Sequence, residues 1–197
     1  MSSKTDVLKF LERFLGENDQ EWDIKNFIQL ETDETKIRIA MALKQTGMEN
    51  FLLIGELYEP ISPKLADFCF SIVKQDHKAL KQLIKHSKNT EWDELNGFSS
   101  KSFALPAWES GTHKGGQEVP TMILQKCLNF KKSCRKAFES MESSCLDPSL
   151  KKVFSRRAME ETIQIKALSS FLENVKELLA APNLKDTSQK NLKGSLT

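Results

Sequence analysis

Apolar residues recur every three or four positions along most of this chain, which is the spacing of one face of an α-helix. The pattern predicts a first helix over residues 6–15, DVLKFLERFL, followed by Gly16, a residue type that commonly ends helices. After a polar stretch, the segment WDIKNFIQL shows a second, shorter group of apolar residues. We predict that this segment forms a short element packed on the rest of the chain.

A pair of long helices is predicted next. The first opens at the segment TDET, with Thr32 or Asp33 as its N-cap, and runs to Glu59, where Pro60 ends it. The second begins at the Ser-Pro pair that follows, because a cap residue and a first-turn proline favour a helix start, and it continues to about His86.

Another pair of helices is predicted in the second half of the chain. One runs from about Pro120 to Ser143. The pair Asp147-Pro148 then repeats the cap-plus-proline start, and the last helix continues to about Leu179. Because helix signals dominate and Gly and Pro are scarce, we expect an all-α protein.

The two pairs are separated by a segment of different composition, residues 88–120, which holds four of the eight glycines, two prolines and two tryptophans. We expect it to be a long crossover that packs onto a helical bundle, since structureless loops of this length are uncommon in compact domains. The predicted organisation is therefore an N-terminal helix and linker over 1–31, a four-helix bundle over 32–180, and a polar, disordered tail over 181–197.

Composition narrows the class of protein. The chain has 197 residues, of which 39% are hydrophobic and 28% charged, values typical of a single globular domain. No apolar run approaches the ~20 residues needed to span a bilayer, and the N-terminus lacks the features of a signal peptide. We therefore expect a cytoplasmic protein without membrane contact.

Motifs of common enzyme classes are absent from the sequence. It contains no Walker loop, no GxGxxG, no GxSxG and no HExxH. The four cysteines include no CxxC pair, so we expect reduced, buried thiols rather than a metal or redox centre.

An internal repeat relates the two pairs of helices. With an offset of 85 residues, Pro63 aligns with Pro148 and Asp76 aligns with Glu161. Both carboxylates fall within apolar stripes at helical spacing. We therefore expect the two side chains to face a shared interior.

Two helical hairpins joined by one long crossover resemble the ferritin-like superfamily, in particular its rubrerythrin-type four-helix bundles. The resemblance covers about residues 33–178. It implies a Glu on the first and third helices and a Glu-x-x-His on the second and fourth, which together hold two iron or manganese ions.

Carried over to this chain, only Glu49 and His77 match that pattern. Lys74 stands where the Glu of the second helix is expected, Cys134 stands where that of the third is expected, and the motif of the fourth helix is missing. A lysine beside a dication would repel it. The resemblance therefore implies a degenerate di-metal site.

The polar residues of the two stripes allow two interpretations. A single metal, iron or manganese, could be held by Glu49, Asp76, His77 and Glu161. Alternatively, the buried carboxylates are paired polar remnants that fix the register of the helices and hold no cofactor. We favour the second interpretation.

Residues 121–166 contain ten basic and five acidic residues. Within them a basic patch is predicted on one helix face, formed by Lys131, Lys132, Arg135 and Lys136. The favoured interpretation of this face is an ordinary solvated surface. As a binding site it would suit an acidic protein or nucleic acid, and nucleic acid is the less favoured partner because no aromatic residues interleave with it.

These observations lead to one favoured function and one alternative. We expect a non-catalytic ferritin-like bundle that acts as a binding or structural module, with a protein partner that could be a second copy of the chain. The alternative is a metal-binding ferritin-like oxidoreductase or metal-handling protein. No catalytic residue is assigned, and the sequence leaves the question of enzymatic activity open.

Overall fold

The structure is a computed structural model that describes residues 24–60, 62–87 and 118–180. Within these ranges the chain is all-helical, with five helices that pack against one another and no strand. The helices are α2 (Ile24–Gln29), α3 (Asp33–Tyr58), α4 (Pro63–Ile84), α5 (Glu118–Ser144) and α6 (Pro148–Ala180). The predicted helix over 6–15, most of the crossover and the tail lie outside the described residues.

The predicted helix starts are confirmed for the long helices that open at a cap residue or a proline. Thr32 is the N-cap of α3, and its hydroxyl oxygen accepts a hydrogen bond from the Thr35 amide at 3.2 Å. Helices α4 and α6 both begin with proline, as the sequence predicts. Before α6, the Asp147 carboxylate accepts a bond from the Ser149 amide at 2.7 Å, which satisfies an N–H group that the helix leaves unpaired.

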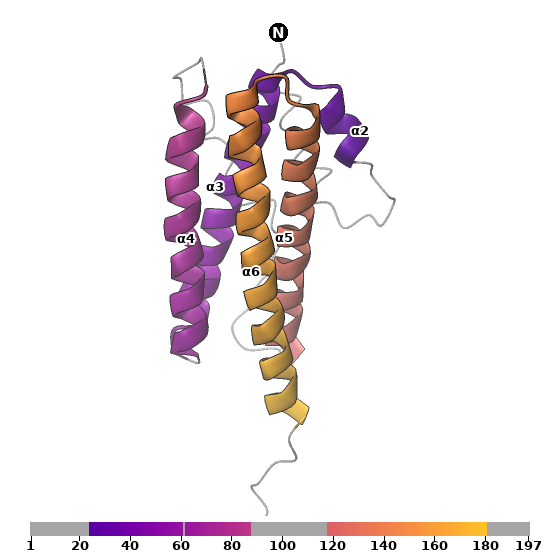
Figure 1. The fold of residues 1–197 in the computed structure, drawn as a ribbon. Coiled ribbons are helices and arrows are strands. Elements are labelled where there is room, and N and C mark those ends of the chain that lie inside the picture. The colour runs from indigo at the N-terminus through magenta and orange to yellow at the C-terminus, as the bar shows by residue number, and fades with distance from the viewer. Residues whose placement is uncertain (1–23, 61, 88–117, 181–197) are drawn as a thin grey trace, which may run out of the picture.

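The long helices form two antiparallel hairpins that lie side by side (Figure 1). Helix α3 pairs with α4, and α5 pairs with α6, while α4 also contacts α6 and α3 contacts α5. The short helix α2 packs on α5 and buries Ile28, which confirms that its segment is a packed element. None of the described helices is long and apolar enough to cross a membrane.

Two apolar clusters fill the interior between the hairpins. One gathers the first half of α3, the second half of α5 and the start of α6, and includes Leu43, Phe138 and Phe154. The other cluster gathers the second half of α3, the first halves of α4 and α5 and a later part of α6, and it includes Phe51 and Leu168. Between these two clusters each long helix places a charged residue, so the core is divided by a polar layer.

The N-terminus of α3 is bound to the turn between α5 and α6. The Asp33 carboxylate accepts hydrogen bonds from the amides of Leu146 and Asp147, each at 3.2 Å. The Lys36 ammonium donates to the Ser144 carbonyl at 2.8 Å, at the C-terminus of α5. Although partial burial acts to raise the pKa of Asp33, the backbone amides outweigh it, and the pKa is lowered.

Candidate functional site

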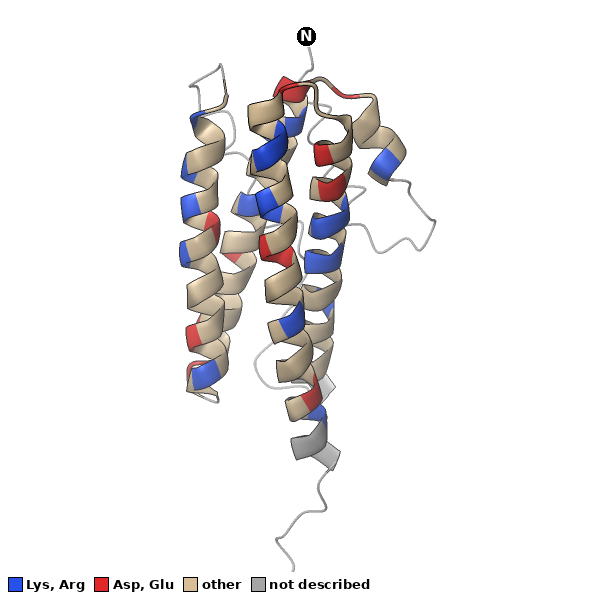
Figure 2. Cartoon of the chain, viewed as in Figure 1, with Lys and Arg blue, Asp and Glu red and all other residues tan. Residues whose placement is uncertain are grey.

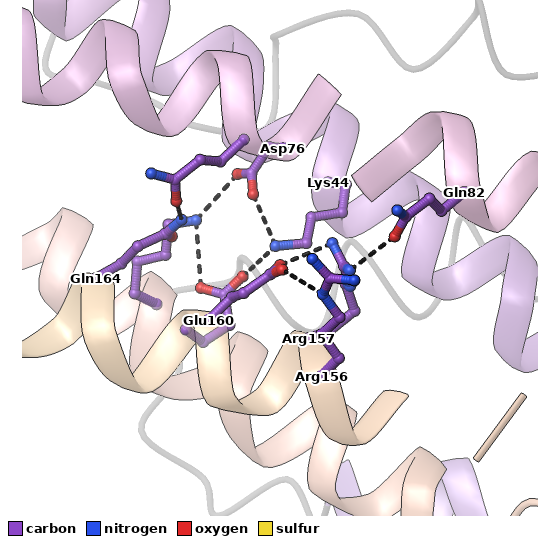
Figure 3. Close-up of polar contacts among 10 residues, drawn as sticks. Lys44, Asp76, Gln82, Arg156, Arg157, Glu160 and Gln164 are labelled. Atoms are coloured by element: carbon purple, nitrogen blue, oxygen red, sulfur yellow. Dashed lines mark hydrogen bonds and ion pairs between the residues drawn. The ribbon is translucent and has the colours of Figure 1, made fainter. Parts of the chain in front are cut away.

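Four charged side chains meet in the polar layer between the two apolar clusters. Each comes from a different long helix, and each side chain is only 1% exposed. Figure 3 shows this layer in close-up, with Lys44 and Asp76 labelled. The four residues, called the charge ring below, are Lys44 of α3, Asp76 of α4, Lys131 of α5 and Glu161 of α6.

Positive and negative groups alternate around the charge ring. The Lys44 ammonium nitrogen lies 2.7 Å from Asp76 Oδ1 and 2.5 Å from Glu161 Oε1. The Lys131 nitrogen lies 3.1 Å from Asp76 Oδ2 and 3.2 Å from Glu161 Oε2. Each lysine therefore contacts one oxygen of each carboxylate, and the two formal positive charges of the ring equal its two formal negative charges.

A glycine leaves room for this arrangement. A Cβ atom added at Gly47 would lie 3.1 Å from Asp76 Oδ2 and 3.8 Å from the Lys131 nitrogen. A side chain at position 47 would therefore crowd the contact between these two groups.

Each lysine of the ring also lies near a phenylalanine of the opposite hairpin. The Lys44 nitrogen is 5.3 Å from the ring centroid of Phe138, and the Lys131 nitrogen is 4.9 Å from that of Phe51. Both distances suit cation–π interactions, which compensate part of the cost of removing an ammonium group from water.

The surroundings of Lys44, Asp76 and Lys131 favour the ionised form of these three groups. Burial acts to raise the pKa of Asp76 and to lower the pKa values of Lys44 and Lys131, because it favours the neutral form of each group. The opposite charges around each group outweigh burial. As a net result the pKa of Asp76 is lowered and the pKa values of both lysines are raised.

Further polar contacts connect α4 and α6 on both sides of the ring (Figure 3). On one side, the Arg157 guanidinium donates to Gln82 Oε1 at 2.9 Å and pairs with Glu160 Oε2 at 2.7 Å. On the other side, Gln164 Nε2 donates to Gln75 Oε1 at 3.1 Å. The ring is therefore the centre of a longer polar seam between the two hairpins.

The predicted metal ligands do not converge. Asp76 and Glu161 are brought together through the two lysines, but His77 is exposed and Glu49 is half-buried, where its Oε1 accepts a hydrogen bond from Gln45 at 3.2 Å. Adjacent helical residues point about 100° apart, so His77 cannot share the inward direction of Asp76. Within the described ranges, no group of three or more His, Cys, Asp or Glu side chains could hold a metal ion. Of the four predicted ligands, the structure thus brings together Asp76 and Glu161, each paired with lysines.

The predicted basic patch also needs a correction. Lys131 belongs to the buried ring, and Arg135 is partly buried and pairs with Glu139 at 3.4 Å. Only Lys132 and Lys136 are fully on the surface. Lys131 is buried because its position faces the carboxylates of the other helices, which the charge of the sequence segment alone does not reveal.

Sequence reasoning missed Lys44, and it missed the buried role of Lys131. A signal was present, because Lys44 and Phe51 are followed 87 residues later by Lys131 and Phe138. The offset of 85 that relates α4 to α6 does not align these residues, since it matches Lys44 with Asn129.

The cysteines offer no further reactive group. All four are buried and free. Burial raises the pKa of Cys69 to about 12 and also raises that of Cys134, so both thiols stay protonated near neutral pH.

No protein-family model, curated protein sequence or solved structure matches this chain.

Proposed function

We propose that this chain is a non-catalytic four-helix bundle of the ferritin-like type that acts as a binding or structural module. In this proposal the charge ring stands where ferritin-like proteins hold their di-metal centre. The observation that carries it is the position of the two lysine ammonium groups, which fill the space between Asp76 and Glu161.

Charge balance supports this proposal. A di-metal centre needs several carboxylates to offset the charge of two dications. Here both carboxylates are already matched by one ammonium group each. A metal ion would have to displace these groups or be repelled by them at close range in a buried site, where electrostatic interactions are strong.

The arrangement of the helices supports the ferritin-like comparison. The two hairpins run α3–α4 and α5–α6, and the described residues leave a gap of 30 residues, 88–117, between them. That is the order expected of two hairpins joined by a crossover. One side chain from each long helix reaches the centre, as the ligands of such a metal site do.

The alternative function is that of a metal-binding ferritin-like oxidoreductase or metal-handling protein with Glu49, Asp76, His77 and Glu161 as its ligands, and elemental analysis separates the two proposals. Protein purified without chelator and without a nickel-affinity step is expected to contain far less than one iron or manganese per chain. Added Fe²⁺ or Mn²⁺ is expected to leave the unfolding temperature unchanged, because ligands stabilise only a protein that binds them.

The variant Asp76→Asn provides the decisive comparison, with the exposed Glu139→Gln, outside every predicted ligand position, as its control. Under the proposed function, neither substitution changes the metal content. Near-stoichiometric iron or manganese in the unmodified protein, lost in Asp76→Asn but kept in Glu139→Gln, would overturn the proposal in favour of the metal-binding alternative.

A further inference from the structure

A row of four lysines runs along the outer face of α4. Lys74, Lys78, Lys81 and Lys85 are spaced four, three and four residues apart, which places them on one face of the helix, and all four are exposed. They cover about 16 Å along the helix axis. Asp76 of the charge ring points the opposite way, into the interior. Figure 2 shows the basic segments succeeding one another along α4.

This row is called the lysine row below, and it has no acidic partner among the residues that the structure describes. No carboxylate in the described part of the chain pairs with any of its four members. The acidic residues of α4 are Asp67, near its start, and Asp76, which is buried in the charge ring. As far as the described residues extend, the outer face of the second half of α4 therefore carries positive charge that no carboxylate pairs with.

The fold does not require lysines at these positions. The C-terminal end of a helix favours a cation, but that effect is confined to the last turn, which holds Lys81. The offset of 85 residues gives Met159 and Ile163 of α6 as the counterparts of Lys74 and Lys78, and they are 65% and 63% exposed. At these two positions the equivalent outer faces of the hairpins thus carry different chemistry, whereas the counterpart of Lys81 is also a lysine, Lys166.

The chemistry of the row indicates its partner. No large apolar side chain of α4 is exposed, although such residues are needed to insert into a lipid surface or to form the centre of a protein interface. The phosphate backbone of nucleic acid, in contrast, is bound non-specifically through cations alone. No aromatic residue of α4 is fully exposed, so this face offers no side chain on which the bases of a single strand could stack.

We propose that the lysine row of α4 docks onto the phosphate backbone of double-stranded nucleic acid without reading its sequence. The inference rests on the proposed binding role of the chain, and it does not depend on whether the charge ring excludes metal. It replaces the predicted patch on α5, of which only Lys132 and Lys136 are fully exposed, as the principal cationic surface.

Fluorescence anisotropy with a short labelled duplex of random sequence tests this inference over a series of salt concentrations. Four phosphate contacts predict that log K falls against log salt concentration with a slope of about −3.5. The variant Lys78→Gln/Lys81→Gln is expected to bind more weakly and to reduce the steepness of this slope by about 2.

The matched control is Lys132→Gln/Lys136→Gln, which removes the same charge from two exposed lysines of α5. It is expected to keep the affinity and the slope of the unmodified protein. Circular dichroism of both variants checks that they remain folded.

Three results would overturn the inference: no binding of the duplex at low salt, equal loss in the two variants, or tighter binding to phosphatidylserine vesicles or to an acidic polypeptide than to the duplex. None of these results bears on the metal content of the protein, so the two proposals fail independently.

Discussion

Each residue of the charge ring depends on two oppositely charged neighbours. Lys44 is the group with the two shortest contacts, to Asp76 and to Glu161. If it is removed, both carboxylates lose a cation while they remain buried. The unfolding free energy lost on such a deletion comes mainly from the buried charge that is left without a partner. It exceeds the net contribution of the intact network to stability.

We predict that Lys44→Met lowers the free energy of unfolding by about 3–5 kcal/mol. The double variant Lys44→Met/Asp76→Leu removes one charge of each sign and leaves Lys131 paired with Glu161. The double variant should therefore lose less unfolding free energy than the sum of the losses in Lys44→Met and Asp76→Leu. Urea unfolding of the four proteins measures the difference, with exposed Lys132→Met as a control that changes stability by less than about 0.5 kcal/mol. Additive losses would contradict the coupling.

At this scale the sequence predicted half of the ring. Asp76 and Glu161 could be found because carboxylates are conspicuous within apolar stripes. Lys44 was missed, although it lies seven residues from both Ile37 and Phe51, which are buried. A lysine at the edge of a stripe usually extends to solvent, and only the carboxylates of other helices decide otherwise.

Among the contacts between elements, the α3–α4 contact depends on a glycine. A Cβ atom added at Gly55 would lie 2.5 Å from Cε1 and 2.9 Å from Cδ1 of the Phe70 ring. The aromatic ring thus packs directly against the backbone of α3. Glycine is unfavourable inside a helix, so its presence there is explained by this close approach.

We predict that Gly55→Ala destabilises the protein by about 1–3 kcal/mol, because the Phe70 ring must move to admit the methyl group. In a Phe70→Ala background the same substitution should stabilise by about 1 kcal/mol, the helix preference of alanine over glycine. Thermal or urea unfolding of the four proteins checks the reversal of sign. A loss of equal size in both backgrounds would show that Phe70 is not the cause.

Helix boundaries were the most predictable feature at the scale of elements. Thr32, Pro63 and Pro148 mark helix starts through local chemistry that does not depend on the rest of the molecule. The repeat was harder to align, because the two carboxylates are 85 residues apart and the two ring lysines 87. A change of two residues turns a helical position by about 200°, so a single offset cannot align both pairs of helices.

For the whole molecule, a charged layer between two apolar clusters makes folding stability depend on pH at both extremes. The folded-state pKa of Asp76 lies below its ordinary value of 3.8, so its contribution is complete above pH 3.8 and is lost as the pH falls through the folded-state value. Those of Lys44 and Lys131 lie above 10.5, so their contribution is complete below pH 10.5 and is lost as the pH rises through the folded-state values.

We therefore predict that the contribution of the ring to stability stays constant between about pH 5 and pH 9 and declines outside this window. The urea midpoint measured against pH tests this for the unmodified protein and for Lys44→Met/Asp76→Leu. The difference in urea midpoint between the two proteins should be constant within this pH window. It should become smaller at acidic pH, where Asp76 takes up a proton. A difference that changes steadily through neutral pH would contradict the prediction.

The way the ring is divided between the hairpins has a consequence for ancestry. Lys44 and Asp76 come from one hairpin, and Lys131 and Glu161 come from the other, so each half of the chain supplies one cation and one anion. Two identical copies of either half, related by a twofold axis, would form the same alternating ring of two cations and two anions. A homodimeric precursor of half the length could thus have had this electrostatic centre before gene duplication and fusion joined its subunits.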